Sequence, residues 1–386
     1  MYLKHIRLLK GRILFLLVAV LLIGLTSSGC IKGLQPIGWS GGAISEGTLF
    51  VGSKEGRLVA INMADGGRQW SEPLRASTAS GGFGCMPVLG GGCATGQARV
   101  AIYGTPAVSG DLVYIGGYNG KIYAYNSSSL GEAKWVYPPA DNIGPIVGGL
   151  TVAHDKVYFG SSDGKVYAVD AAMGDKQWEF ETGDQVWSTP TVEDDTLYVG
   201  SFDKKLYALN ATDGSKKWEF LTEGAITSAP LVYENTVYFG SFDRHLYAVD
   251  AIRGTLKWKF MSENWFWAKP VVINNTVYAG SLDGKVYALR ADSGSKVKEF
   301  DLGSPVSSVP VVIDNSIIFA SRKGVIYRLD TDSNQLRLLA DVEEEVYGPL
   351  SASEGIVYIH TQDLRLHRVN ADTGAMLMPI SLKSSE

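Results

Sequence analysis

The sequence contains few of the residues that build metal and redox centres. Only three cysteines and five histidines occur among its 386 residues. The histidines do not follow the spacing of metal ligands, and a zinc site at the cysteines would need two more ligands that no nearby histidine supplies. We therefore predict no metal site and interpret all five as ordinary surface or core residues: His5, His154, His245, His360 and His367.

Long apolar runs are also scarce. The run over residues 13–25 has thirteen residues, whereas a membrane-spanning helix needs about 20. It is followed by Ser28, Gly29 and Cys30, which resemble a bacterial lipobox, although Ser27 stands where Leu is usual. This pattern predicts a lipoprotein signal peptide over residues 1–29, with Cys30 lipidated and residues 30–35 forming a lipid-anchored linker. An uncleaved anchor helix that extends to residue 31 is the alternative.

Positive charge is not in excess. The formal net charge is −5, and residues 1–29 contribute four basic and no acidic residues, so the rest of the chain has 31 basic and 40 acidic residues and a net charge of −9. Nucleic acid and bare anionic membrane are therefore poor partners, and membrane attachment would come from the N-terminal lipid. Because a positive flank stays inside, the globular part is expected outside the cytoplasm.

Cys85 and Cys93 are separated by seven residues. In an oxidising compartment this spacing favours a local disulfide. A free pair of thiols or an adventitious metal site are the alternatives.

Glycine and aromatic residues, by contrast, are abundant and recur with a fixed period. The chain has 45 Gly, 19 Tyr and 9 Trp. One position of the repeat recurs every forty residues at Gly160, Gly200, Gly240, Gly280, Ala320 and His360. In two earlier copies of the repeat, Gly116 and Gly52 occupy this position. The extra length between the first two copies falls in residues 71–100, which we interpret as an insertion. The sequence thus has eight repeat units.

Each unit predicts four short antiparallel strands. In the fourth unit, "WSTPTVED", "TLYVGS", "KLYALN" and "KKWEF" are apolar or alternating segments separated by turn residues. Four strands cannot bury both faces alone, so successive sheets must stack on one another. We predict one all-β domain over residues 36–386, an eight-bladed β-propeller of four-stranded antiparallel blades.

A tryptophan recurs on the last strand of most units, where it can pack between neighbouring blades. These residues are Trp70, Trp135, Trp178, Trp218 and Trp258. Burial of roughly 200 Å² at about 25 cal/mol/Å² gives each a gross gain of about 5 kcal/mol, an upper bound. Lys298, Leu338 and Met378 replace tryptophan in the last three units, which are expected to be the least regular.

The segment from Ala208 through Asn210 and Gly214 to Trp218 resembles the tryptophan-docking repeat of the pyrroloquinoline-quinone (PQQ) propellers. The resemblance covers nearly all of residues 36–380, and the Gly-His and Trp-Asp pairs of WD40 propellers are missing. Some members of the family are dehydrogenases that hold PQQ and calcium. Their adjacent cysteine pair and long insertions are absent here, so the resemblance implies the non-enzymatic branch, lipoproteins of outer-membrane assembly, without a cofactor.

Other catalytic patterns receive structural interpretations. Residues 160–164 fit Gly-x-Ser-x-Gly, but that motif needs a strand-to-helix elbow and here lies on a predicted hairpin. An aspartate recurs at the same hairpin in other units, where it favours a tight turn, with calcium binding as the alternative. These aspartates are Asp163, Asp203, Asp243, Asp283 and Asp363.

The candidate binding site lies at the start of the first strand of each unit. The aligned position is occupied by Trp39, Tyr103, Val147, Trp187, Thr227, Trp267, Ser307 and Tyr347. These side chains should meet at one mouth of the central channel, with Trp265 and Phe266 beside them and acidic residues on the entering loops: Asp184, Glu223, Glu263, Asp301 and residues 343–345. Aromatic residues bordered by charge are typical of interfaces. Alternatively, the aromatic residues simply pack the channel and the acids are solvated.

We therefore expect a monomeric, lipid-anchored propeller that serves as a scaffold for envelope proteins. The resemblance implies the β-barrel assembly machinery as a partner, at the periplasmic face of an outer membrane, or the outer face of the cell membrane if there is only one membrane. A ligand-sensing or adhesion module and a PQQ-dependent dehydrogenase are the alternatives.

Overall fold

The structure is a computed structural model that describes residues 39–53, 55–74, 100–129 and 131–383. The predicted signal peptide, the linker and Cys30, Cys85 and Cys93 lie outside these residues. Within them, no helix is long and apolar enough to cross a membrane.

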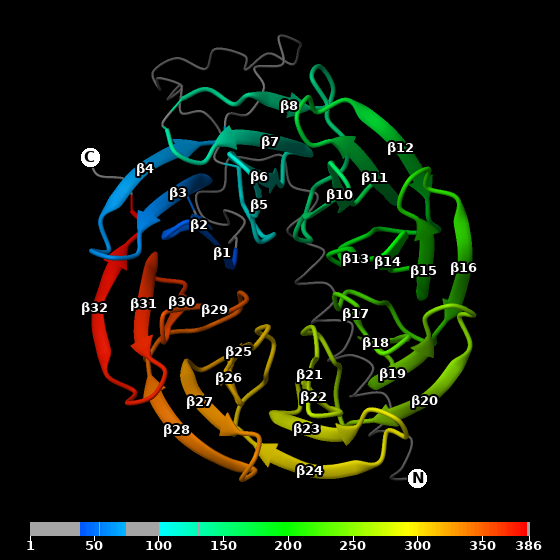
Figure 1. Ribbon diagram of the computed structural model, residues 1–386, viewed down its shortest axis with the longest axis vertical. Coiled ribbons are helices and arrows are strands. Elements are labelled where there is room, and N and C mark those ends of the chain that lie inside the picture. The colour runs from blue at the N-terminus through cyan, green and yellow to red at the C-terminus, as the bar shows by residue number, and fades with distance from the viewer. Residues whose placement is uncertain (1–38, 54, 75–99, 130, 384–386) are drawn as a thin grey trace, which may run out of the picture. The chain divides into compact units, whose positions relative to one another are not determined.

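The described residues form eight four-stranded antiparallel sheets, each built from four consecutive strands (Figure 1). The sheets are arranged around a central channel, with the first strand of each innermost and the fourth outermost. The predicted all-β, eight-bladed propeller is therefore confirmed.

The strand bounds follow the repeat. Blades one to four contain β1 (Gly42–Ser45), β2 (Thr48–Gly52), β3 (Arg57–Asn62), β4 (Arg68–Pro73); β5 (Ala107–Ser109), β6 (Leu112–Gly117), β7 (Lys121–Asn126), β8 (Trp135–Tyr137); β9 (Thr151–Ala153), β10 (Lys156–Gly160), β11 (Lys165–Asp170), β12 (Lys176–Glu181); β13 (Thr191–Glu193), β14 (Thr196–Gly200), β15 (Lys205–Asn210), β16 (Lys216–Leu221). Blades five to eight contain β17 (Leu231–Tyr233), β18 (Thr236–Gly240), β19 (His245–Asp250), β20 (Leu256–Met261); β21 (Val271–Ile273), β22 (Thr276–Gly280), β23 (Lys285–Arg290), β24 (Lys296–Asp301); β25 (Val311–Ile313), β26 (Ser316–Ala320), β27 (Val325–Asp330), β28 (Gln335–Asp341); β29 (Ser351–Ser353), β30 (Ile356–His360), β31 (Arg365–Asn370), β32 (Met376–Ser381).

The second and third strands of each blade are buried on both faces. In blade four, Leu197 and Leu209 are fully buried and pair across β14 and β15. The predicted first strand is shorter than "WSTPTVED", because only residues 191–193 pair with β14. The preceding residues 187–190 enter from the connection between blades and reach β13.

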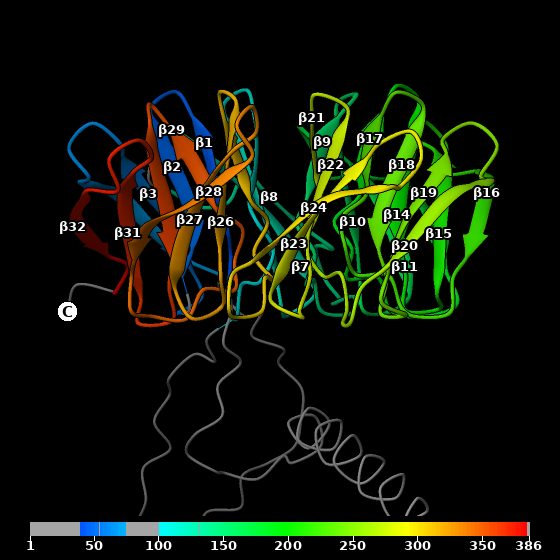
Figure 2. The same cartoon turned by 90° about the horizontal axis from the view of Figure 1, so that it is seen from below.

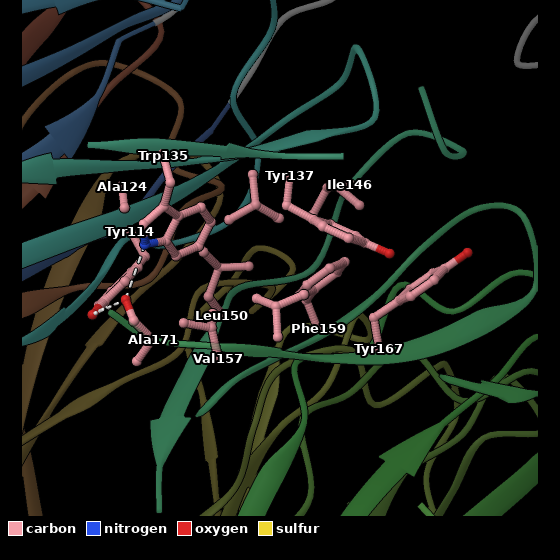
Figure 3. Packing of buried hydrophobic residues seen from close by; sticks show 12 residues of the cluster. Tyr114, Ala124, Trp135, Tyr137, Ile146, Leu150, Val157, Phe159, Tyr167 and Ala171 are labelled. Carbon is pink, nitrogen blue, oxygen red and sulfur yellow. Dashed lines mark hydrogen bonds between the residues drawn. The ribbon is translucent and has the colours of Figure 1, made fainter. Parts of the chain in front are cut away.

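Neighbouring blades are joined by apolar cores, five of which contain an indole. In the core of blades two and three, Trp135 packs with Leu150, Val157 and Ala171 (Figure 3). Its Nε1 donates a hydrogen bond of 3.0 Å to the carbonyl oxygen of Ala171. Tyr114 of the same blade donates to that oxygen at 3.1 Å. Each tryptophan thus provides apolar contact while its only polar group is satisfied.

The other docking tryptophans form the same contact with the next blade. In each case Nε1 donates a hydrogen bond to a backbone carbonyl oxygen. The pairs are Trp70 with Ser127, Trp178 with Ala211, Trp218 with Ala251, and Trp258 with Ala291. For all of these tryptophans except Trp70, the indole lies directly over a glycine of the next blade. A Cβ on Gly214, which has a φ of 76°, would lie 2.7 Å from the ring of Trp178. Glycine is required here for both its conformation and its small size.

Different cations take over this role where tryptophan is missing. Lys298 Nζ donates to the carbonyl oxygen of Asn334 at 2.7 Å. In blade seven, Arg328 Nη1 donates to that of Ala371 at 2.7 Å. Blade six keeps the register shift of blades three to five, whereas blades seven and eight shift at other positions, Ile326/Tyr327 and Leu366/Arg368. Among the last three blades, the irregular register is therefore confined to blades seven and eight. Blade two also departs from the pattern, because β8 has only three residues.

The propeller closes through side-chain packing between blades one and eight. Leu49 and Ile61 of blade one share a core with Tyr358 and Leu382. Ser351 Oγ donates to the carbonyl oxygen of Gly42 at 2.8 Å, and Arg68 Nη2 donates to that of Ser381, also at 2.8 Å. The final segment "AMLMPISL" forms β32 of blade eight, as predicted.

The predicted insertion over residues 71–100 begins too early. Residues 71–73 belong to β4, whose register with β3 extends to Pro73. Leu74 is buried in the core of blades one and two. At the other end of the segment, Val100 belongs to the same core. Residues 75–99 lie outside the described residues.

Candidate functional site

One face of the propeller carries two kinds of loop, which we call the connection face. Because the strands of a blade alternate in direction, the turn from the second to the third strand and the connection to the next blade lie on the same side. Figure 2 shows this face at the lower edge. The residues that lead into each innermost strand start here and enter the channel.

The recurring aspartate of the hairpin turn fixes these connections in place. Asp243 accepts hydrogen bonds from Tyr247 Oη at 2.7 Å and from the backbone N–H of Glu223, in the incoming connection, at 3.0 Å. Asp203 is bonded in the same way to Tyr207 and Gly183, at 2.6 Å each. Burial and the partner carboxylate raise the pKa of these tyrosines, so each stays a donor. The turn interpretation is confirmed for Asp163, Asp203, Asp243 and Asp283.

All eight residues of the aligned position line one cavity at the channel mouth, as predicted. The cavity has a volume of about 100 Å³. Its wall includes Trp39, Tyr103, Val147, Trp187, Thr227, Trp267, Ser307 and Tyr347. The five aromatic side chains are half-buried, so each is packed on one side and accessible on the other.

The aromatic side chains form two clusters, of which the first spans blades four to six. In this first cluster Phe242 stacks on Trp265, with ring centroids 4.4 Å apart, and on Trp267, 5.4 Å apart. Phe202 contacts Phe242 at 6.1 Å and Trp187 at 4.7 Å. Phe202 and Phe242 were not predicted as site residues, because their "SFD" segments indicate turns.

The second cluster joins blades one, two, seven and eight. Trp39 contacts Tyr103 at 4.7 Å and stacks on Tyr347 at 5.9 Å. Tyr118, at the position of Phe202 in its repeat, contacts Tyr103 at 5.4 Å. The Arg322 guanidinium lies 5.1 Å from the centre of the Tyr347 ring. Burial and the phenol of Tyr118 raise the pKa of Tyr103 to about 12, so its hydroxyl stays protonated.

The structure separates the two residues that precede Trp267. Trp265 is 37% exposed and carries part of the surface of the first cluster. Phe266 is only 1% exposed and packs between blades against Tyr287. The prediction of Phe266 as a partner-binding residue is therefore wrong. It occupies the core position that Val186 and Ile226 fill in the preceding blades, and its carbonyl oxygen and Cβ lie against Gly240, as those of Val186 and Ile226 do against Gly160 and Gly200.

Acidic side chains surround the mouth, as expected from the loops that enter it. Asp184, Glu223, Glu263 and Asp301 are exposed, and so are Glu343 and Glu345, while Glu344 is half-buried. Glu345 Oε2 accepts a hydrogen bond of 3.1 Å from Tyr347 Oη. The aromatic mouth is thus bordered by negative charge.

The other chemical motifs have structural roles. Ser162 of the Gly-x-Ser-x-Gly pattern lies in the turn between β10 and β11, where its Oγ accepts a 3.0 Å hydrogen bond from Trp187 Nε1. No group of three or more potential metal ligands occurs among the described residues. His360 and His367 are buried, and His360 Nδ1 lies 2.9 Å from the carbonyl oxygen of Ser40.

The cavity does not suit PQQ with calcium. None of its eighteen described lining residues is an Asp, Glu, Asn or Gln, the side chains that supply calcium ligands. Only Lys269 among them is charged, whereas PQQ carries three carboxylates. Lys269 was not predicted as a site residue, although it is the one charged residue at its repeat position.

Comparisons with known proteins agree with this architecture. A family model described as outer membrane protein assembly factor BamB matches residues 31–185 and 181–377. The crystal structure of BamB from Moraxella catarrhalis is similar with a TM-score of 0.66 and 20% identity, over 88% of this chain and 95% of that chain. The computationally designed protein Ika8 is similar with a TM-score of 0.68 and 18% identity, over 86% and 96%. No match was found among curated proteins.

At these identities the two structures show the fold alone. The family model also shows the family, because its two matches together cover most of the chain. This chain belongs to the family of the outer membrane protein assembly factor BamB.

Proposed function

We propose that the protein is a non-enzymatic, lipid-anchored scaffold of outer-membrane protein assembly, and that it binds a partner of the assembly machinery through the aromatic mouth of the connection face. Membership of the BamB family supports the role. The anchor rests on the Cys30 segment of the sequence. A propeller of this kind supplies a rigid platform rather than a reactive centre.

The observation that carries the proposed site is the first cluster. Its rings contact one another, with Phe242 stacked on Trp265 and Trp267, yet they are only partly covered, and Trp265 is 37% exposed. Residues that only packed the channel would be buried like Phe266, which is 1% exposed. Stacked, rigid aromatic side chains lose little entropy on binding, which makes them effective anchors at interfaces.

The rim determines what kind of partner fits. Exposed carboxylates next to aromatic rings favour a partner surface that presents basic and apolar side chains together. Arg is well suited, because its guanidinium stacks on indole while pairing with a carboxylate. Electrostatic attraction of this kind weakens as salt rises.

The test is capture of partners from solubilised envelopes by tagged full-length protein. We expect recovery of barrel-assembly components by the wild type and loss of that recovery in Trp187→Ala/Trp267→Ala. The matched control is Leu377→Ala/Met378→Ala, which removes two exposed apolar side chains from the outer strand β32. Circular dichroism checks that both variants are folded.

Two outcomes would contradict the proposal. Equal capture by the two double variants would exclude the mouth as the binding site. Dye-linked alcohol or sugar oxidation, together with a stoichiometric chromophore after addition of PQQ and calcium, would contradict the non-enzymatic role.

A further inference from the structure

The cavity at the channel mouth has an unusual charge arrangement. Lys269 is the only charged residue among the eighteen described residues that line it. At the same position of the other seven repeats the residues are Gly41, Thr105, Gly149, Thr189, Ala229, Val309 and Pro349, none of which ionises. Four of these are glycine, alanine or proline, so one long cationic side chain extends among small neighbours.

No neighbouring group neutralises this lysine. Lys269 has no hydrogen-bond or ion-pair partner among the described residues. Burial lowers its pKa, and no carboxylate lies close enough to counter that effect. The acids of the rim are therefore too far away to act as its counter-ion. The Lys269 side chain is half-buried. An unpaired ammonium that burial disfavours is costly for a fold, so its presence calls for a ligand that pairs with it.

Two hydroxyl groups of the same cavity wall are also unsatisfied. Thr227 and Ser307 belong to the blades on either side of Lys269, and both line the cavity. Their Oγ atoms are buried without a hydrogen-bond partner in the part of the chain described, and Ser307 is 6% exposed. Rotation about χ1 between staggered positions would turn each hydroxyl towards a bound acceptor. These groups, like Lys269, can donate hydrogen bonds.

The walls and rim limit what the acceptor can be. Indoles of Trp187 and Trp267 line the cavity, so a flat apolar group fits beside them. A volume of about 100 Å³ admits only a small molecule. One cation balances one negative charge, so an anion of higher charge would keep an unpaired charge inside the cavity.

We propose that this cavity binds a small monocarboxylate with a flat apolar body. Its carboxylate pairs with the Lys269 ammonium and accepts hydrogen bonds from Thr227 and Ser307, while its body lies against the indoles. This ligand site goes beyond the scaffold role and does not depend on which protein the mouth binds.

Benzoate is the probe, and isothermal titration calorimetry of the full-length protein is the measurement. Benzamide has the same shape without the charge. We expect benzoate to bind one site at least tenfold more tightly than benzamide, and Lys269→Met to lose that difference. Lys323→Met, which removes an exposed cation from a turn of the same face, is the charge-matched control and should bind benzoate like the wild type. Thr227→Val/Ser307→Ala should weaken benzoate severalfold.

Three results would overturn the site. They are equal affinity of the wild type for benzoate and benzamide, unchanged benzoate affinity in Lys269→Met, and the absence of benzoate binding by the wild type at tens of millimolar. Near-UV circular dichroism establishes that Lys269→Met keeps its aromatic packing, so that lost binding is not lost folding. An equal loss of binding in Lys323→Met would also contradict the site, since it would indicate attraction by net charge alone.

Discussion

Arg328 Nη1 donates a 2.7 Å hydrogen bond to the carbonyl oxygen of Ala371 in the next blade. Trp178 Nε1 makes the equivalent contact with Ala211 at 3.1 Å. The arginine comes from the third strand of its blade and the tryptophan from the fourth, so side chains from different strands satisfy the same position in the neighbouring blade.

This contact predicts that Arg328→Met destabilises the propeller. The carbonyl oxygen of Ala371 and the carboxylate of Asp372 would each lose a charged donor, at a cost of about 1–3 kcal/mol. Urea unfolding followed by tryptophan fluorescence measures it. Arg253→Met, at an exposed turn residue, should change the midpoint little. Equal effects of the two substitutions would show that the contact between blades contributes nothing.

Phe266 and Trp265 should respond in opposite ways to replacement by alanine. Phe266→Ala removes a ring that is 1% exposed, with an expected loss of about 3–5 kcal/mol of unfolding free energy. Trp265→Ala removes a partly exposed ring, so a loss below about 1 kcal/mol is expected, with weaker partner capture. Thermal unfolding and envelope pull-downs provide the two measurements. If Phe266→Ala left stability unchanged and reduced capture, its assignment to the core would be wrong.

Asp243 should link stability to acid pH. Burial raises the pKa of its carboxyl, but hydrogen bonds from Tyr247, Glu223 and His245 outweigh that effect and lower the pKa. A carboxyl with a lowered pKa stabilises the fold fully above its unfolded value, near 4, and loses this contribution as pH falls through the folded value. Asp243→Asn should therefore be less stable than the wild type at pH 7, with a difference that shrinks below pH 4. A difference in urea midpoint that stays constant from pH 7 to pH 3 contradicts this linkage.

Lys269 should also make stability rise with pH, but in the alkaline range. Its pKa is lowered by burial, so between the folded value and the unfolded value of about 10.4 the unfolded chain binds more protons. Stability of the wild type then rises with pH in that window. Lys269→Met should be more stable at pH 7 by roughly 1–2 kcal/mol, and its advantage should shrink towards pH 10. A variant less stable than the wild type at pH 7 would show that the ammonium is favourably solvated.

The regular part of the fold could be predicted from the sequence because each repeat unit contains the same strand and turn pattern. Alternation in "TLYVGS" and "KLYALN" places Leu197 and Leu209 in the core, and the glycine at each strand end marks the register. The residues of the channel mouth could be predicted from the same alignment, since equivalent residues of a closed ring of blades lie at the same level along the channel axis.

The remainder depends on contacts between repeats that an alignment does not contain. Phe266 and Trp265 are adjacent bulky residues, and only the direction of the strand decides which of them faces the core. Phe202 and Phe242 belong to turn segments, so their contact with the indoles depends on how neighbouring blades approach each other. Arg328 stands in an alanine position, and nothing in the sequence states that it reaches the next blade.

Every blade of this propeller is completed by its own stretch of chain, and Leu49 and Tyr358 meet across the seam without exchange of a strand. The first and last blades are thus held together by side-chain packing and hydrogen bonds, as other neighbouring blades are, although without an indole. No single junction is topologically special. A circularly permuted gene that opens the ring between β16 and β17 and joins the present ends through a flexible linker should encode the same eight-fold disc.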